Sequence, residues 1–220
     1  MNSLRVLLLG ASGGIGSCVG RLAAERGHDV TALIRPHTPY DPPPGVDLVR
    51  GEVLQSKTLD GLLPGREVVV SCLGLKRTWK SPYARLLSPP DLVATVTRSL
   101  VIAMHARGVP RLILVSAGVV GSSRARTSWL VRRLIDAGNL GVAYADLARA
   151  EVYLADSGLD YLMVRPVTLT NGRPTGRGGL VARYGILSTV RRADVAAWIV
   201  DALEQSEPFV PKDVMIGTNR

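Results

Sequence analysis

The chain has 220 residues, of which 46% are hydrophobic and 20% charged, and no stretch is dominated by a few residue types. This composition is typical of a folded globular protein and excludes a disordered or fibrous chain. At this length we expect one domain. The apolar run from Leu4 to Leu9 is far shorter than the roughly 18 residues of a membrane span and lacks the flanks of a signal peptide. We therefore expect no membrane span and a cytoplasmic location.

The net charge of +9 comes mainly from arginine, because only four of the 27 basic residues are lysines. Such a balance can indicate nucleic acid, a membrane surface or an anionic substrate. The arginines are scattered along the sequence, and aromatic residues, which stack on bases, make up only 5%. Nucleic acid is therefore not favoured as a partner. Cys18 and Cys72 have no metal-binding spacing, so we expect reduced structural thiols and no metal.

Short apolar runs alternate with longer amphipathic stretches, which is typical of βαβ units. In chain order the pattern predicts strands at 4–10, 28–34, 46–51, 67–74, 111–116 and 159–166. It predicts helices at 17–26, 56–63 and 91–107, one that ends near Ser157, and one at 192–204. The runs LLL, VVV and LILV are apolar throughout, as expected of strands covered on both faces. The predicted fold is α/β, a doubly wound parallel sheet (Rossmann fold) in three α/β/α layers, with residues 1–220 as a single domain.

Three residues are interpreted as structural. Asp91 follows two prolines and is the expected N-cap of the long helix. Asp194 lies in the first turn of the last predicted helix, where a carboxylate suits the helix dipole. Trp198, in the same helix, is expected to be a core aromatic residue.

The stretch VLLLGASGGIGSCVG, residues 6–20, joins the first predicted strand to the first helix through Gly10, Gly13 and Gly16. In this context Gly10 permits a tight turn, Gly13 lets backbone N–H groups approach a pyrophosphate, and Gly16 lets the helix pack on the sheet. The helix N-terminus favours the anion. The alternative is a glycine-rich turn without a ligand. The candidate cofactor-binding residues of this turn are Gly10, Ser12, Gly13, Gly14 and Ile15.

The second predicted strand ends at Arg35, where NAD-binding proteins usually carry an acid for the ribose hydroxyls. An arginine there can instead pair bidentately with a 2′-phosphate and stack on adenine. This position favours NADP (NADPH) over NAD as the cofactor. The alternative is an ordinary exposed arginine.

Seven stretches carry a resemblance to a known family: GASGGIG, ALIRP, GEVLQ, VVVSCLG, RLILVSAG, ADSGLDYLMVRP and RRADVA. Together they resemble the atypical short-chain dehydrogenase/reductases, in particular the small NAD(P)H-binding proteins similar to NmrA and to biliverdin reductase B, also called flavin reductase. The resemblance covers nearly the whole chain and is specific for fold and cofactor rather than for substrate.

The resemblance also implies site residues at the strand ends. Glu52 and Val53 would border the adenine, and the segment Cys72, Leu73 and Gly74 would line the ribose side. Ser116 to Gly118 and Pro166 to Thr168, including Val167, would flank the nicotinamide. The alternatives are a turn serine at Ser116 and a loop-forming proline at Pro166.

Many short-chain reductases use a Tyr and a Lys four residues apart to donate a proton. This pair is missing here, because the residue four positions after Tyr144 is Ala148. The candidate catalytic residues are therefore Ser116, as a group that orients substrate, and Tyr144, for which packing is the alternative. A flavin, quinone or conjugated tetrapyrrole needs no strong local acid and would suit such a site.

Three loops are expected on the substrate side, around 75–90, 117–140 and 166–190. The first contains Lys76, Arg77 and Trp79 and either covers the site or is simply solvated. Residues 122–139 are expected to form an amphipathic basic helix. This helix is interpreted as a lid, a membrane-surface element, a dimer contact or a helix packed on the core.

The favoured function is an NADPH-dependent oxidoreductase acting on a small, planar or conjugated substrate, with an anionic substrate and a homodimer as open options. The alternative is a non-catalytic NADP(H)-sensing regulatory protein of the NmrA-like type. A nucleotide-sugar epimerase or dehydratase ranks lower, because those relatives normally carry the Tyr/Lys pair and a larger C-terminal domain.

Overall fold

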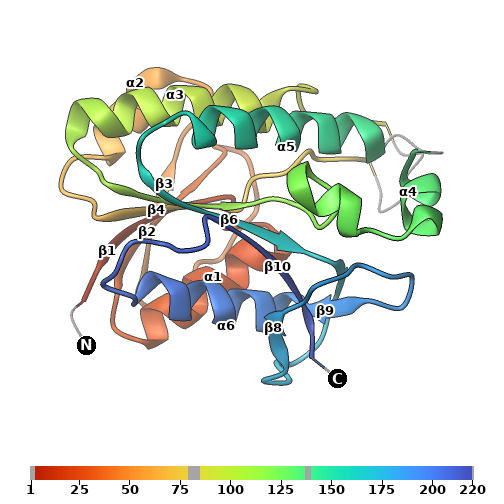
Figure 1. The fold of residues 1–220 in the computed structure, drawn as a ribbon. Helices are drawn as coiled ribbons and strands as arrows, with labels where there is room; N and C mark the ends of the chain where they lie inside the picture. Colours follow the sequence, from red (N-terminus) through yellow and green to blue (C-terminus); the bar gives the residue numbers. More distant parts are fainter. Residues whose placement is uncertain (1–2, 79–84, 137–139, 220) are drawn as a thin grey trace.

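The computed structural model describes residues 3–78, 85–136 and 140–219, so Trp79 lies outside the described residues (Figure 1). The strands are β1 (Arg5–Leu9), β2 (Asp29–Ile34), β3 (Val46–Arg50), β4 (Val68–Ser71), β5 (Arg111–Val115), β6 (Asp160–Pro166), β7 (Thr168–Thr170), β8 (Gly178–Leu180), β9 (Thr189–Arg191) and β10 (Asp213–Thr218). The α-helices are α1 (Gly14–Glu25), α2 (Ser56–Leu62), α3 (Leu92–Arg107), α4 (Trp129–Asp136), α5 (Leu140–Ala155) and α6 (Arg192–Leu203), and Gly121–Arg126 form a 3-10 helix, η1.

Within the described residues, the main sheet has eight strands in the order β3-β2-β1-β4-β5-β6-β10-β8. Strands β1 to β6 and β10 are parallel, which confirms the predicted doubly wound Rossmann-type fold. Strand order reverses between β1 and β4, and ligands of such sheets bind at this switch point. The edge strand β8 runs antiparallel to β10, so the sheet is parallel except at this edge.

Helices cover both faces of the sheet, with α1 and α6 on one face and α2, α3 and α5 on the other (Figure 1). The central strands are apolar throughout because successive side chains enter opposite cores. In β1, Val6 and Leu8 belong to the α1–α6 core, whereas Leu7 and Leu9 belong to the α2–α3–α5 core. Helix α1 begins at Gly14, three residues earlier than predicted, so the glycine turn itself forms the start of the helix.

The side chain that caps α3 differs from the predicted one. Asp91 occupies the N-cap position but its side chain makes no cap hydrogen bond. Instead Asp146, fully buried in α5, accepts hydrogen bonds from the backbone N–H groups of Val93 and Ala94, both at 2.9 Å. The capping acid therefore comes from a neighbouring helix, which also fixes α3 against α5.

The predicted basic helix 122–139 is not one helix. Residues Gly121–Arg126 form η1, and α4 starts only at Trp129. The Thr127 hydroxyl donates to the carbonyl groups of Gly118 and Ser123, both at 3.0 Å, which holds the break between the two. Asp194 and Trp198 are placed as expected, since Asp194 is buried in the first turn of α6 and Trp198 packs against the core. Asp194 also accepts hydrogen bonds from the backbone of Thr175 and Gly176.

The start of β6 is tied to β5 and to the segment before β10 through Asp160. Its carboxylate accepts hydrogen bonds from Arg111 Nε at 3.0 Å, the Phe209 N–H at 3.0 Å and Lys212 Nζ at 2.8 Å. Partial burial alone would raise the pKa of Asp160. The hydrogen bond from Lys212, the Phe209 N–H and the charges of Lys212 and Arg111 outweigh burial and lower this pKa.

We expect Asp160→Asn to lower the free energy of unfolding by about 1–3 kcal/mol at neutral pH, because charge-assisted hydrogen bonds are lost. A lowered folded-state pKa stabilises the protein above the unfolded-state value of about 3.9, and this contribution is lost as pH falls through the folded-state pKa. The difference in the free energy of unfolding between wild type and variant should therefore become smaller below about pH 4. Urea unfolding at several pH values measures it, and a difference that does not change with pH would contradict the assignment.

Candidate functional site

The glycine turn between β1 and α1 forms an open cradle of backbone N–H groups. Gly10 has a φ of 80°, and a Cβ there would lie 2.6 Å from the Cys72 carbonyl oxygen. A Cβ on Gly16 would overlap the Gly10 carbonyl. Gly13 is the N-cap, without a side-chain cap hydrogen bond, and the first turn of α1 contains no acid. The positive end of α1 can thus attract an anion.

A cleft of ≈ 630 Å³ extends from this turn along the carboxyl ends of β4, β5 and β6. Predicted site residues on its wall are Gly13, Gly14, Ile15, Cys72, Leu73, Gly74, Ser116, Tyr144, Pro166 and Val167. Most of the remaining wall is apolar and includes Val131, Leu134 and Ile135 of α4. The structure therefore brings the turn, the β4 and β5 ends and both catalytic candidates to one cleft.

The other predicted cofactor contacts, Gly10, Ser12, Arg35, Glu52 and Val53, lie outside this cleft wall but on the same edge of the sheet. Arg35 follows the last residue of β2 and is exposed, and Glu52 is exposed two residues after β3. The strands pair in parallel with Ile34 beside Arg50, so Arg35 and Glu52 both follow carboxyl ends of neighbouring strands. The adenosine contacts expected of Arg35 and Glu52 stay a prediction, and the two residues lie at the ends of paired strands.

Ser116 contributes a buried hydroxyl to the cleft wall. It lies just after β5, its residue is 7% exposed, and its Oγ is buried with no hydrogen-bond partner among the described residues. Its backbone N–H is used, because it donates to the Val164 carbonyl at 2.7 Å. A buried hydroxyl without a partner is costly, so Ser116 is the residue of the cleft wall whose hydrogen bonding most needs to be accounted for.

Tyr144 lies on the cleft wall from α5, with a pKa above its ordinary value. Burial raises the pKa most, the nearby Tyr184 adds to this, and the charge of Arg77 lowers it. The phenol is therefore protonated at neutral pH.

Sequence reasoning missed two polar wall residues of the 166–192 region, Tyr184 and Arg192, whereas Thr168 belongs to the predicted segment Pro166 to Thr168. The Tyr184 hydroxyl and Thr168 Oγ1 are 2.7 Å apart and form a hydrogen bond inside the cleft. Arg192, the first residue of α6, donates from Nη1 to Asn171 Oδ1 at 2.7 Å and packs against Gly14, where a Cβ would lie 2.6 Å from its Cδ. Arg192 thus adds positive charge beside the glycine turn. The only sequence signal for it was the RRADVA stretch.

The two cysteines are free thiols. Burial, with a smaller contribution from Cys18, raises the pKa of Cys72 to about 12, so this thiol on the cleft wall is neutral and a poor nucleophile. No group of three or more His, Cys, Asp or Glu that could hold a metal occurs in the described part of the chain.

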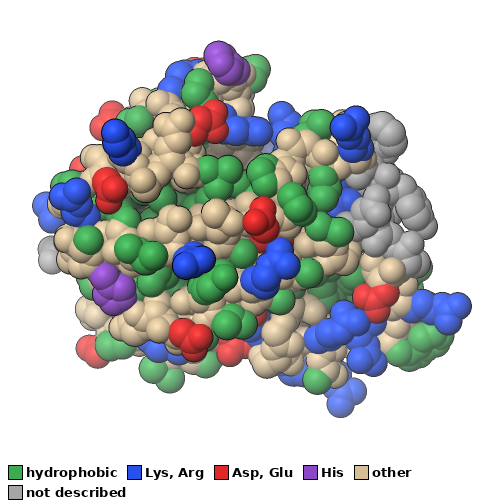
Figure 2. Space-filling view, turned by 90° about the horizontal axis from the view of Figure 1, so that it is seen from above, with side chains coloured by type: hydrophobic (Ala, Val, Ile, Leu, Met, Phe, Trp, Pro, Cys, Tyr) green, Lys and Arg blue, Asp and Glu red, His purple; other side chains and the backbone are tan. Residues whose placement is uncertain are grey.

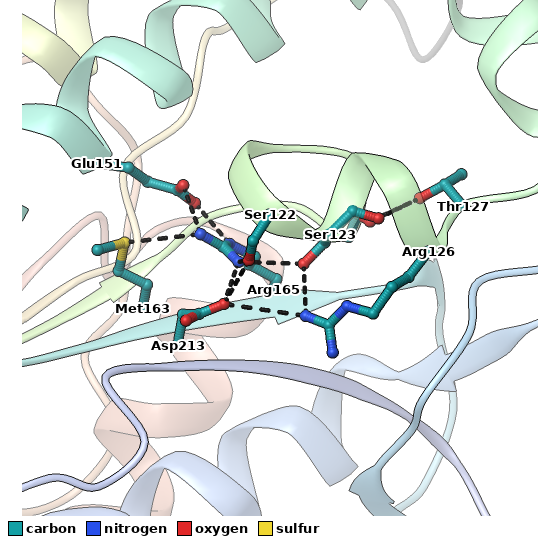
Figure 3. Close-up of polar contacts among 9 residues, drawn as sticks. Ser122, Ser123, Arg126, Thr127, Glu151, Met163, Arg165 and Asp213 are labelled. Atoms are coloured by element: carbon teal, nitrogen blue, oxygen red, sulfur yellow. Dashed lines mark hydrogen bonds and ion pairs between the residues drawn. The ribbon is translucent and has the colours of Figure 1, made fainter.

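A buried ionic network behind the cleft fixes the segment that leads to α4 (Figure 3). Arg165 of β6 donates bidentately to Glu151 of α5, at 2.9 and 2.7 Å, and also binds Asp213 of β10. Its Nη1 further donates to Ser122 and Ser123 of η1, at 2.7 and 3.1 Å. The network joins two strands, a helix and η1, and so supports the α4 wall of the cleft.

Comparison with known proteins agrees with this geometry. Residues 10–206 match a family described as NAD(P)H-binding, and the chain therefore belongs to this family. It is 26% identical over 210 residues to the uncharacterized chloroplastic protein At2g34460 of Arabidopsis thaliana, covering 92% of this chain and 73% of that protein.

Two solved structures share the fold. ChuY from Escherichia coli O157:H7, described as an anaerobilin reductase, has a TM-score of 0.74 at 24% identity, covering 96% of this chain and 95% of that chain. A short-chain dehydrogenase/reductase from Veillonella parvula in complex with NADP has a TM-score of 0.76 at 19% identity, covering 96% and 93%. The chain is thus an NAD(P)H-binding protein with the fold of short-chain dehydrogenase/reductases.

Proposed function

We propose that the protein is an NADPH-dependent oxidoreductase that reduces a small, planar or conjugated substrate. The observation that carries this proposal is the buried Ser116 hydroxyl, which has no hydrogen-bond partner among the described residues. It lies on a mostly apolar cleft that begins at the glycine turn. The turn fits a pyrophosphate, and the cleft beyond it has room for flat rings. Membership of the NAD(P)H-binding family supports the cofactor class.

NADPH is preferred to NADH in this proposal because of Arg35. The residue follows β2, where an NAD-binding protein would carry an acid, and its guanidinium has neither ion pair nor hydrogen bond among the described residues. A free guanidinium there can bind a 2′-phosphate bidentately.

The residues of the cleft position the substrate rather than supply a strong acid. When bound, the nicotinamide supplies hydride, and the chain's own groups orient the acceptor and exclude water. Ser116 would hydrogen-bond the substrate or the carboxamide beside it. Tyr144 is a protonated hydrogen-bond donor without the lysine that lowers a tyrosine pKa. The acceptor is thus one that water can protonate, such as a flavin, quinone or other conjugated ring.

The missing lysine also favours a second candidate, an NADP(H)-sensing protein without turnover. Tyr144 with a raised pKa is a poor proton donor to a carbonyl at neutral pH. Such a protein would use the cofactor contacts described above and leave the apolar cleft for a ligand or partner. We rank it second because it gives no role to the unpartnered Ser116 hydroxyl on the cleft. In either case we expect a cytoplasmic protein.

The test is titration of purified protein with NADPH and NADH, followed by NADPH oxidation against a panel of flavins, quinones and carbonyl compounds. We expect tighter binding of NADPH and turnover of ring acceptors. Tight binding of NADPH with no turnover across the panel would favour the sensing protein, and equal, weak binding of both nucleotides would contradict the cofactor proposal.

Ser116→Ala separates a role in binding from a role in folding. Because the Ser116 hydroxyl has no partner, its removal should leave the thermal midpoint unchanged or slightly higher. With the best acceptor found, kcat/KM should fall about tenfold, the value of a lost hydrogen bond in a dry site. Ser157→Ala, a serine in the turn after α5, is the matched control for activity. Unchanged turnover by Ser116→Ala would remove Ser116 from the site.

A further inference from the structure

The folded chain concentrates its positive charge at the open end of the cleft. Residues 117–136 and 166–193 contain nine arginines and one acid, Asp136, and so account for +8 of the net charge of +9. The two segments meet in the structure. The Ser128 N–H donates to the Tyr184 carbonyl at 2.9 Å, and the Tyr184 N–H donates to the Arg126 carbonyl at 3.1 Å. Arg126 and Arg183, which are far apart in the sequence, therefore lie in segments that touch.

Large apolar side chains are exposed at the same end. Trp129 and Leu134 of α4 are 66% and 58% exposed, and Ile186 and Leu187 are 54% and 74% exposed. Leu134 and Ile186 also line the cleft, Trp129 lies in the same helix as Leu134, and Leu187 follows Ile186 in the chain. These four residues are here called the apolar rim. The inward residues of α4, Val131 and Ile135, are buried, whereas Trp129 and Leu134 on its outer face stay exposed in the described part of the chain.

The figures show the same arrangement. Helix α4 lies at one end of the molecule beyond the sheet, at the right of Figure 1. Viewed from the side of α3 and α5, Figure 2 shows Lys and Arg side chains together with hydrophobic ones at that right-hand end. Cationic and apolar groups are therefore mixed on one surface.

The charge of this surface decides between a second copy and an anionic partner. A symmetric dimer through the apolar rim would bring arginines against arginines, because Asp136 is the single acid of the two segments and already pairs with Arg124 at 2.9 Å. Arg133 and Arg183 are exposed and have no carboxylate partner among the described residues. The surface therefore needs an occupant that supplies negative charge around an apolar centre.

We propose that the apolar rim and its arginines dock the protein on an anionic lipid bilayer. Lipid headgroups supply the negative charge, and the acyl region accepts Trp129 and Leu187, a combination typical of interfacial binding. The binding is peripheral, since no described helix is long and apolar enough to cross a membrane. Docked in this way, the cleft mouth between Leu134 and Ile186 opens onto the lipid surface.

The test is flotation with lipid vesicles of phosphatidylcholine alone or with about 30% phosphatidylglycerol, at low salt and at about 0.5 M salt. We expect the full chain to float with the anionic vesicles at low salt, with most of this binding lost on phosphatidylcholine and at high salt. NADPH binding, measured in parallel, checks that each variant is folded. No flotation of the wild type with anionic vesicles at low salt would overturn the proposal.

Two double variants and two matched controls locate the surface. Trp129→Ser with Leu187→Ser should lower vesicle partitioning at least tenfold, and Arg133→Ser with Arg183→Ser about tenfold or more. The apolar control is Ile102→Ser with Val210→Ser, two residues 64% and 88% exposed away from the cleft. The charge control is Arg98→Ser with Arg107→Ser, both exposed on α3.

The vesicle partitioning of the two control variants should stay within about twofold of the wild-type value. An equal loss of vesicle binding in the control variants would mean that binding depends on net charge or on exposed apolar area in general. This result would overturn the assignment to the apolar rim. Light scattering tests the alternative occupant of this surface, a second copy of the chain. A dimer in solution that the Trp129→Ser and Leu187→Ser double variant converts to monomer would assign the surface to self-association instead.

Discussion

Arg165→Met should lower the free energy of unfolding by about 3–5 kcal/mol, the cost of breaking a buried ion pair. The side chains of Arg165 and Glu151 are 4% and 6% exposed, so the substitution leaves the Glu151 carboxylate buried without its bidentate partner. Burial alone would lower the pKa of Arg165, but Glu151 and Asp213 raise it above its ordinary value, so the guanidinium is charged in the fold. Urea unfolding at neutral pH measures the loss.

A second variant shows whether the loss comes from the unpaired acid. Arg165→Met combined with Glu151→Leu removes both buried charges, and most of the stability should return. The remaining acid, Asp213, has a side chain that is 33% exposed and keeps a hydrogen bond from Ser122 at 2.9 Å. The control is Arg98→Met, which replaces an exposed arginine. Its free energy of unfolding should stay within about 0.5 kcal/mol of the wild-type value. A double variant no more stable than the single one would show that the guanidinium acts by packing and by its bonds to η1.

This network also marks the limit of what the sequence could predict. Strand β6 was predicted from its apolar run, and Arg165 within it carries no sign of its partners. Glu151 is 14 residues earlier and Asp213 is 48 residues later, so only the folded chain brings them together. The same holds for Asp146, whose cap on α3 spans 53 residues, whereas Asp91 occupied the position that local rules favour.

The strands divide in the same way. β1 to β6 were predicted because each is apolar on both faces or flanked by clear helices. β8, with the sequence GGL, has no periodicity of its own and forms by antiparallel pairing with β10. β10 follows α6 and pairs in parallel with β6, but it lies beyond the last element that the sequence pattern predicted.

The candidate site was predicted where its chemistry is local. The glycine turn and the β4 and β5 ends combine a strand, a short motif and a following turn or helix within one stretch of sequence. Tyr184 and Arg192 reach the cleft through a long connection without such a motif, and the shared end of the arginines depends on the contact between residues 126–128 and Tyr184. Spatial convergence of distant segments is the part that sequence patterns do not contain.

Arg35→Asp should reverse the cofactor preference. The change removes a charge-assisted, bidentate contact to a 2′-phosphate and places a like charge beside it, so NADPH affinity should fall about 100-fold or more. NADH lacks that phosphate, and Asp at the end of β2 can accept hydrogen bonds from its ribose hydroxyls. NADH affinity should therefore change less than about threefold, or improve. Fluorescence titration of both nucleotides gives the two dissociation constants.

The control for the altered net charge is Arg98→Asp, which makes the same change of two units on exposed α3. This variant should weaken NADPH binding by less than about twofold, because a distant exposed charge is screened by salt. Equal, small losses of NADPH and NADH in Arg35→Asp would exclude a 2′-phosphate contact, while leaving the glycine turn as a pyrophosphate site for either nucleotide. A large loss confined to NADPH would fix the adenosine end at β2, and the cleft at Ser116 would then be the nicotinamide end.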